Sequence, residues 1–169
     1  MAERRFDGKT GFLTGGAKGI GRATAMRFLA EGGQLAVFDK EAGDSAFADA
    51  LRKNVGDAAN RLCYIQTDAT DEASVRDAVA AANEQVGTPN ILVNNVGFGA
   101  NPKPIEQLEL DEWRTFMDIN LTSMFLITRA VLPQMRASGG GRIINLASVA
   151  GRSISEISAL HCSTAKSGV

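Results

Sequence analysis

The chain has 169 residues, of which 44% are hydrophobic, and a formal net charge of −1 at pH 7. This length suits one domain, because a domain of about 150 residues buries roughly 70% of its unfolded surface. The balanced charge, without any basic run, argues against a nucleic-acid partner. No apolar stretch approaches the roughly 20 residues that span a bilayer, and no signal-peptide core follows the N-terminus, so we expect a cytoplasmic protein without membrane contact.

Metal ligands and disulfide partners are scarce. Cys63 and Cys162 stand far apart in the sequence, and His161 is the only histidine. Neither cysteine has the short spacing to a second ligand that zinc sites show, and two cysteines do not build a disulfide scaffold. We therefore expect no metal site.

The first predicted strand and helix are joined by a glycine-rich loop. Residues 11–13 are apolar, residues 20–31 form an amphipathic run, and the connecting residues 14–21 contain Gly15, Gly19 and Gly21. A strand that turns through glycines into a helix N-terminus presents free backbone N–H groups and the positive end of the helix dipole to an anion. The loop therefore predicts a diphosphate cradle, with a tight strand-to-helix turn as the plain alternative.

Short apolar runs then alternate with helical patterns. Residues 35–38, 62–65, 91–93 and 143–146 have the length of strands buried on both faces. A long helix is predicted over residues 111–135, and one stripe of it should pack into the core. That stripe consists of Trp113, Met117, Leu121, Met124, Thr128, Val131 and Met135. The alternation predicts one α/β dinucleotide-binding domain over residues 1–169, a doubly wound parallel sheet between two helical layers, with ligands at the C-terminal strand ends.

Two aspartates follow predicted strands. Asp39 closes the second strand, where a carboxylate accepts hydrogen bonds from ribose hydroxyls and repels a 2′-phosphate. It therefore favours NAD over NADP. Lys18, beside the glycine loop, would either meet that phosphate or remain a solvated loop lysine. Asp68, after the third strand, is either an adenine ligand or a turn or helix-cap aspartate.

The later strand ends carry a second set of polar residues. Residues 94–97 (NNVG) end the fourth strand, Ser148 follows the fifth, and Lys166 lies farther along. Together with the glycine loop, both aspartates and Asn120, these residues resemble the ordered motifs of the short-chain dehydrogenases/reductases. The resemblance extends over essentially the whole chain. Val96, where that family usually has alanine, is a conservative departure.

The resemblance implies NAD as cofactor and hydride transfer between C4 of its nicotinamide and an alcohol or ketone carbon of the substrate. Ser148 would polarise the substrate oxygen, Lys166 would hold the nicotinamide ribose, and Asn120 would anchor a water of the proton relay. Each residue also has a structural alternative when it is taken singly. Ser148 could be a cap or turn serine, Lys166 an exposed helix lysine, and Asn120 a hydrogen bonder inside a helix. The implied cofactor-binding residues are Gly15, Lys18, Gly19, Ile20, Gly21, Asp39, Asp68, Ala69, Asn95, Gly97 and Lys166.

The tyrosine that completes the family's catalytic set stands four residues before the lysine, and here that position holds Cys162. A cysteine is too short to reach the same oxygen, although its thiol pKa of about 8.5 lies below the phenol value of about 10. Tyr64, the only tyrosine, is in the third-strand region. His161 should face elsewhere, because neighbouring helix residues point about 100° apart, so we expect a structural histidine.

The resemblance also implies further strands and loops beyond Val169. Without them, the fifth strand would be a sheet edge with uncovered apolar side chains, which invites pairing with another chain. We therefore expect a piece of a larger polypeptide, or one that meets the C-terminal remainder of its fold as a separate piece. The family also pairs its long helices, which implies a homo-oligomer, a dimer or tetramer.

The sequence favours a NAD-dependent alcohol/ketone oxidoreductase that is impaired by Cys162. The main alternative is a non-catalytic dinucleotide-binding or scaffold protein that kept the cradle and lost the acid. A methyltransferase that binds S-adenosylmethionine would use a glycine loop and Asp39, but it gives no reason for Ser148 and Lys166. The residues that would shape a substrate pocket lie beyond the sequence or in the loop over residues 98–104.

Overall fold

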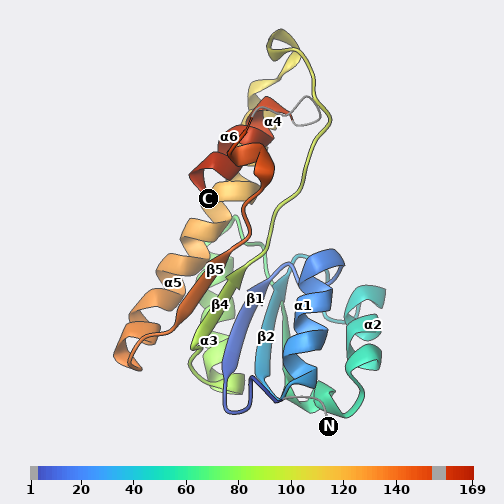
Figure 1. Cartoon of the computed structure of the whole chain (residues 1–169), viewed down its shortest axis with the longest axis vertical. Coiled ribbons are helices and arrows are strands. Elements are labelled where there is room, and N and C mark those ends of the chain that lie inside the picture. The colour runs from blue at the N-terminus through green and yellow to red at the C-terminus, as the bar shows by residue number, and fades with distance from the viewer. Residues whose placement is uncertain (1–3, 154–158) are drawn as a thin grey trace.

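A computed structural model describes residues 4–153 and 159–169, and within them five parallel strands form one sheet in the order β3-β2-β1-β4-β5 (Figure 1). The strands are β1 (Thr10–Thr14), β2 (Gln34–Asp39), β3 (Leu62–Gln66), β4 (Ile91–Asn94) and β5 (Arg142–Asn145). The chain runs from β1 outward to β3 and then returns to pair β4 with the other side of β1. This order confirms the doubly wound sheet and puts its reversal point between β1 and β4.

Helices cover both faces of this sheet. They are α1 (Gly19–Ala30), α2 (Ala46–Val55), α3 (Glu72–Val86), α4 (Leu110–Met117), α5 (Ser123–Ala137) and α6 (Leu160–Gly168), with short 3-10 turns at Gly56–Arg61, Ile105–Gln107 and Val149–Gly151. Local signals set the ends of α3: the Asp71 carboxylate accepts from Ser74 N (2.6 Å), and Gly87 ends the helix at φ +81°. Within the described part of the chain, no helix combines the length and apolar character needed to cross a membrane.

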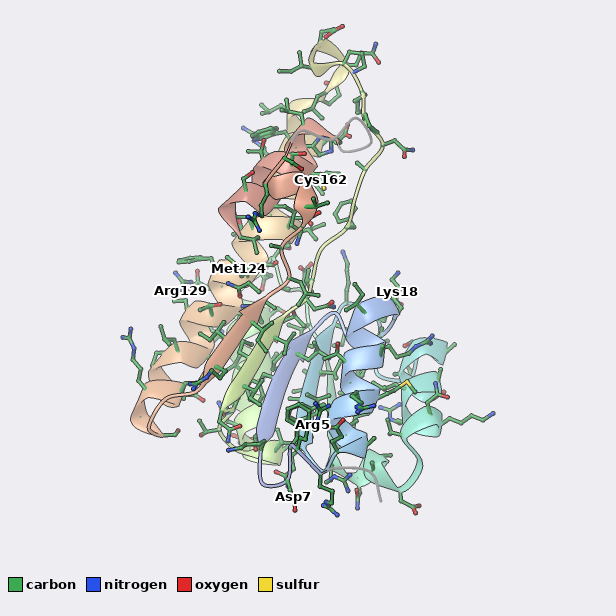
Figure 2. The ribbon with its side chains drawn as sticks, in the orientation of Figure 1. Arg5, Asp7, Lys18, Met124, Arg129 and Cys162 are labelled. Atoms are coloured by element: carbon green, nitrogen blue, oxygen red, sulfur yellow. The ribbon has the colours of Figure 1, made fainter. Side chains whose placement is uncertain are left out.

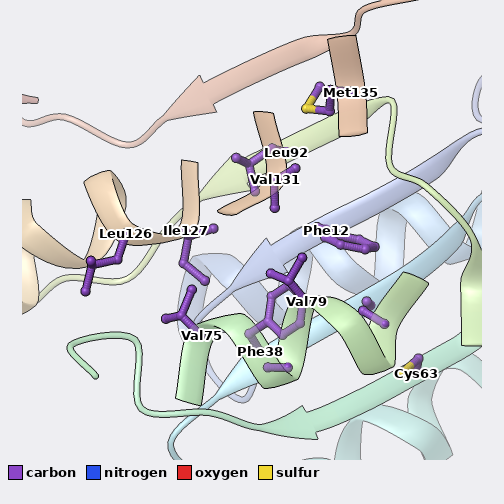
Figure 3. Packing of buried hydrophobic residues seen from close by; sticks show 13 residues of the cluster. Phe12, Phe38, Cys63, Val75, Val79, Leu92, Leu126, Ile127, Val131 and Met135 are labelled. Atoms are coloured by element: carbon purple, nitrogen blue, oxygen red, sulfur yellow. The ribbon is translucent and has the colours of Figure 1, made fainter. Parts of the chain in front are cut away.

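Alternate strand residues feed two cores, one on each face of the sheet. Phe12, Phe38 and Leu92 pack with α3 and α5 (Figure 3), whereas Leu13 and Val37 pack with α1 and α2. This alternation is the pleat of a sheet that is covered on both sides. The three α/β/α layers predicted from the sequence are therefore confirmed.

The predicted long helix is present but is not a regular α-helix. A π-helical segment (Asp118–Thr122) joins α4 to α5, and its extra backbone residue changes the rotation of the helix locally. The predicted core stripe was wrong in register over much of its length. The residues actually buried along these elements are Phe116, Asn120, Ser123, Leu126, Ile127, Val131 and Met135. Periodicity misled because the helix has apolar residues on several sides, as the exposed Phe125 shows.

Strand β5 is the other correction. The short apolar run predicts a strand buried on both faces, whereas β5 lies at the sheet edge, paired only with β4 among the described strands. Its Ile143 and Ile144 side chains are 37% and 49% exposed. Since successive strand residues point to opposite faces, the exposure of both side chains shows that neither face of β5 is fully covered within the described chain.

The end of α1 is tied to the N-terminal segment by a buried carboxylate. Glu31 is 2% exposed and accepts hydrogen bonds from Nε of Arg5 (2.5 Å) and Nη2 of Arg5 (2.7 Å), and it also pairs with Arg27. The Arg5 hydrogen bond, together with the Arg27 hydrogen bond and both positive charges, outweighs the opposing effect of burial and lowers the pKa of Glu31 from 4.5 to about 2.

This pair predicts an acid-sensitive contribution to stability. Because the folded-state pKa of Glu31 is depressed, its contribution is present above about pH 4.5 and is lost as pH falls toward about 2. Glu31→Gln should lower the urea midpoint at neutral pH, and the difference from the unmodified protein should shrink across that window. Glu84→Gln, on the exposed face of α3, is the matched control. A difference that stays constant from pH 7 to about pH 2.5 would contradict the assignment.

Candidate functional site

A cleft of about 860 Å³ runs across the C-terminal ends of the strands. Its lining comes from the loop after β1, the ends of β2 to β5 and one side of α6. Figure 2 shows Lys18 at the start of α1 and Cys162 on α6, the two elements that bound it. The sequence-predicted residues in the lining are Gly15, Lys18, Gly19, Ile20, Asp39, Asp68, Ala69, Asn95, Gly97, Ser148, Cys162 and Lys166. Gly21 and Asn120 are not part of that lining.

The glycine loop closes against its own helix. A side chain on Gly21 would place Cβ 2.0 Å from the Gly15 carbonyl oxygen, so only glycine fits there. Gly15 and Gly19 have φ values of +69° and +57°, which L side chains rarely adopt. Apart from its chain neighbours and its own helix backbone, no atom lies within 4 Å of a Cβ built on Gly19, which lines the cleft at the N-terminus of α1. An anion can therefore reach these backbone N–H groups.

Side chains from β1 and β4 hold this loop in place. Asn95 Nδ2 donates to the carbonyl oxygens of Thr14 (2.9 Å) and Gly15 (2.8 Å). In return, the Thr14 hydroxyl accepts from the backbone N–H groups of Asn95 (3.0 Å) and Val96 (3.1 Å). The loop and the end of β4 therefore form one hydrogen-bonded unit at the strand-order reversal.

Asp39 connects β2 to the same loop. Its Oδ2 accepts from Ala17 N at 2.7 Å, and its Oδ1 accepts from Glu41 N at 3.1 Å. Each carboxylate oxygen has a further lone pair that points to other partners. Lys18 and Lys40 also line the cleft near this end. A carboxylate flanked by two lysines therefore lies where the sequence expected the ribose contact.

Asp68 stands in the lining after β3, and it also shapes its own turn. Its Oδ1 accepts from both the backbone N–H (2.9 Å) and the hydroxyl (2.6 Å) of Thr70. These two bonds lower the pKa of the Asp68 carboxyl, so the group is held in its charged form. Within the chain, Asp68 therefore has the contacts of a turn aspartate. Because it also lines the cleft, a ligand can still reach it.

Ser148 begins the 3-10 turn after β5. Its Oγ accepts from Ala150 N at 3.2 Å, which is the contact of the cap or turn serine that the sequence allowed as an alternative. Since a hydroxyl oxygen that accepts this bond still has its own proton to donate, Ser148 can offer a hydrogen bond to the cleft. The cap fixes the side chain at the rim, beside the lining residues Leu146 and Ala147.

Lys166 reaches into the cleft from α6. Its Nζ donates to the Leu146 carbonyl at 2.8 Å, which leaves two further protons of the ammonium group for other acceptors. Burial lowers the pKa of Lys166 below its usual value. A Cβ on Gly97 would lie 3.0 Å from Nζ, so the absent side chain makes room for the ammonium group. Lys166 is thus half-buried, and it is not the exposed helix lysine that the sequence allowed as an alternative.

Cys162 also lines the cleft, and its thiol contacts the loop after β4. It donates to the Phe98 carbonyl across an S···O distance of 3.9 Å. The neighbouring His161 points the other way: it is 1% exposed, packs edge-on to Phe116 (ring centroids 4.0 Å apart) and lies 3.6 Å from a Glu112 carboxylate oxygen. These contacts confirm that His161 faces away from the cleft.

Asn120 lies behind the wall of the cleft in the π-helical segment. It is 1% exposed, its Oδ1 accepts from Phe98 N (3.0 Å) and its Nδ2 donates to the Phe116 carbonyl (3.2 Å). A Cβ on Gly97 would come within 2.8 Å of Asn120 Oδ1, so only that glycine separates the amide from the cleft. In the structure, Asn120 has the contacts of a helix-interior hydrogen bonder that supports the loop after β4.

Several cleft residues were not anticipated from the sequence. Thr67 and Ile119 line it without carrying a recognisable motif, whereas Phe98 belongs to the loop over residues 98–104 that the sequence predicts to shape the substrate pocket. Thr67 was findable, since it directly follows β3 at the edge where ligands meet the sheet. Ile119 gives no such signal, because its place depends on how the loop after β4 crosses the π-helical segment. Across residues 4–153 and 159–169, no cluster of three or more His, Cys, Asp and Glu side chains is arranged to hold a metal ion.

Comparison with known proteins gives matches over nearly the full chain. Residues 9–169 match the short chain dehydrogenase family profile. The chain is 34% identical over 164 residues to cis-4-hydroxycyclohexanecarboxylate dehydrogenase of Sinomonas cyclohexanicum, covering 97% of this chain and 64% of that protein. It is also 34% identical over 148 residues to 2-dehydro-3-deoxy-L-rhamnonate dehydrogenase (NAD(+)) of Sphingomonas sp. (strain SKA58), covering 88% of this chain and 57% of that one.

A solved structure shares the architecture. Carveol dehydrogenase from Mycobacterium avium in complex with NAD superposes with a TM-score of 0.87 at 29% identity, over 97% of this chain and 62% of that chain. The chain thus spans less than two thirds of the length of each of these three relatives. With a family match over residues 9–169 and a shared fold, the chain belongs to the short-chain dehydrogenase family.

Proposed function

We propose that the protein is a NAD-dependent oxidoreductase that interconverts an alcohol and a ketone, and that Cys162 impairs the chemical step. One observation carries the proposal: a single cleft has the glycine loop and Asp39 at one end and Ser148, Cys162 and Lys166 at the other. A dinucleotide that lies along the cleft would connect the two groups of residues. Two of the relatives are named as dehydrogenases of alcohols, cis-4-hydroxycyclohexanecarboxylate and carveol, which supports the same reaction class.

The residues at the first end fit the adenosine and diphosphate parts of NAD. Gly15 and Gly19 leave the start of α1 open to a diphosphate, and Asp39 offers lone pairs to ribose hydroxyls. Asp68 and Ala69 line the place where adenine would lie, and Asn95 and Gly97 border the path toward the nicotinamide. NAD supplies the hydride acceptor or, when reduced, the hydride donor.

Asp39 decides the choice between NAD and NADP in this proposal. A 2′-phosphate beside the carboxylate would bring two negative groups together. In this proposal, their repulsion outweighs the attraction that Lys18 or Lys40 would exert on the phosphate. The backbone bonds from Ala17 and Glu41 keep the carboxylate fixed in this place. NAD is therefore the proposed cofactor.

Replacing Asp39 tests this choice. Asp39→Ala should weaken NAD binding and reduce the discrimination against NADP, because both the ribose acceptor and the repelling charge are removed. Calorimetric dissociation constants for the two cofactors measure the effect. Asp44→Ala, exposed and outside the cleft lining, serves as the matched control. Tighter binding of NADP than of NAD by the unmodified protein would contradict the proposal.

At the other end, three side chains would handle the substrate and the proton. Ser148 donates its free hydroxyl proton to the substrate oxygen, since its own oxygen already accepts from Ala150. Lys166 directs its two remaining N–H groups toward the nicotinamide ribose while the third stays on Leu146. Asn120 supports this end from behind Gly97 and, in the proposal, anchors a water of the proton relay.

Cys162 leaves this set without an acid of the required reach. Its sulfur is one bond beyond Cβ and already faces the Phe98 carbonyl, whereas a phenol hydroxyl at the same position would extend across a whole ring. Ser148 and Lys166 remain in place to bind substrate and cofactor. The proposed consequence is a site that binds NAD better than it turns over substrate.

Restoring the ring should restore turnover. In the full-length protein, Cys162→Tyr should raise NAD reduction with a panel of secondary alcohols by roughly 10²–10⁴-fold, the range typical of a positioned acid–base group. Cys162→Phe is the control that fills the same space without a hydroxyl. Equal rates above background for the two variants, with NAD bound to both, would place the acid elsewhere. Background rates in both variants would favour the alternative of a non-catalytic dinucleotide-binding or scaffold protein.

Homo-oligomer formation is a further part of the proposal. Ile143 and Ile144 expose apolar surface on the edge strand β5, and Phe125 exposes an aromatic ring on α5. Such surface tends to pair with a second chain. Light scattering of residues 1–169 should therefore show assembly, and Ile144→Lys should reduce it because a charge on the edge opposes strand pairing. A monodisperse monomer with a cooperative unfolding transition would contradict this prediction.

A further inference from the structure

We infer that the substrate carries a carboxylate and that Arg152 binds it in a hollow next to Ser148. This inference rests on the proposed function, because Ser148 is there assigned to the oxygen of the reacting alcohol or ketone. It adds the class of substrate: a hydroxy acid or keto acid whose carboxylate lies in the hollow that shares Ala147 and Ser148 with the cofactor cleft.

The hollow adjoins the cleft at Ser148. It has a volume of about 540 Å³ and is lined by Ala147, Ser148, Val149, Arg152 and Ser153. Ala147 and Ser148 also line the main cleft, so the two spaces meet at the residue that would hold the reacting oxygen. A substrate held at Ser148 therefore has one end toward the nicotinamide position and room for its other end beside Arg152.

The backbone that carries Arg152 is fixed relative to the rest of the site. Arg152 N donates to the Val149 carbonyl at 2.9 Å, in the turn that Ser148 caps. This turn packs tightly on α6: Ser167 Oγ donates to the Gly151 carbonyl (2.9 Å), and a Cβ on Gly151 would lie 2.3 Å from the Lys166 carbonyl oxygen. Arg152 therefore has a constant position relative to the helix that bears Cys162 and Lys166.

The charges along the site are divided between its two ends. The acidic residues in the lining, Asp39, Glu41 and Asp68, belong to the β2 and β3 ends, where the adenosine part of NAD is proposed to bind. Around Ser148, the charged residues that line either space in the described chain are both cations, Lys166 and Arg152. Since Lys166 is assigned to the cofactor ribose, Arg152 is the cation that remains for the substrate.

Arg152 suits a carboxylate in its own chemistry. Its side chain is exposed in the hollow, and the described ion pairs do not include it. A guanidinium fork matches the two oxygens of a carboxylate with parallel hydrogen bonds. One cation also matches one negative charge, whereas a phosphate monoester is close to dianionic at neutral pH. These features favour a carboxylate over a phosphate ester.

Binding to the NADH-loaded protein tests this without relying on turnover. The probes are 4-oxopentanoate and 4-oxocyclohexanecarboxylate, each compared with its methyl ester, and the readout is the change in bound-NADH fluorescence. The acids should bind about tenfold more tightly than the esters, because only they can form the charged pair. Arg152→Gln should abolish this preference and leave the NADH dissociation constant unchanged. Arg136→Gln, which removes the same charge outside both spaces, should alter neither.

The outcomes separate this inference from the proposed function. Equal binding of acids and esters, no binding of either acid, or an acid preference that survives Arg152→Gln would overturn the carboxylate site while NADH still binds. Tighter binding of dihydroxyacetone phosphate than of either keto acid would replace the carboxylate by a phosphate and overturn the assignment as stated. Failure of NADH to bind at all would overturn the proposed function, and this inference with it.

Discussion

The close approach of the glycine loop to the end of β4 is the constraint on which the rest of the site depends. Asn95 ties the carbonyl groups of Thr14 and Gly15 to β4, and Gly21 can follow only because it lacks a side chain that would strike Gly15. This contact brings the start of α1 to the point where the strand order reverses. Any side chain at Gly21 would push the helix away from the strand and open the floor of the cleft.

At the opposite end of the cleft, glycines again allow a close approach between neighbouring segments. Gly97 leaves the space into which Lys166 Nζ and Asn120 Oδ1 extend, and Gly151 allows the turn after β5 to touch the backbone of α6. The position of α6 beyond the C-terminal ends of the strands (Figure 1) thus follows from two missing side chains and from the Lys166 bond to Leu146. Residues from distant parts of the sequence can meet at this end of the cleft because glycines stand where a side chain would collide with its neighbours.

The sequence identified what depends on local pattern and strand order. The five strands, the glycine loop and Asp39 were all predictable, since parallel strands direct their C-terminal ends to one edge. What escaped prediction depends on tertiary contacts. The buried face of α5 was misassigned because the helix is apolar on several sides and a π-helical segment precedes it. The bond from Ala17 N to Asp39 was equally invisible, since it joins a loop to a strand that follows it by a whole helix.

The proposed effect of Cys162, a slower chemical step without loss of cofactor binding, agrees with the contacts that surround it. The thiol occupies the correct turn of α6, four residues before Lys166, and its neighbours keep their contacts: Ser148 caps its turn and Lys166 remains bonded to Leu146. None of these contacts uses the side chain at position 162, so losing a phenol there would not disturb them. The proposed impairment therefore concerns proton transfer, because the Cys162 thiol donates to the Phe98 carbonyl and is too short to extend farther. In that proposal, the site keeps its affinity for a cofactor while the step that consumes the cofactor is slowed.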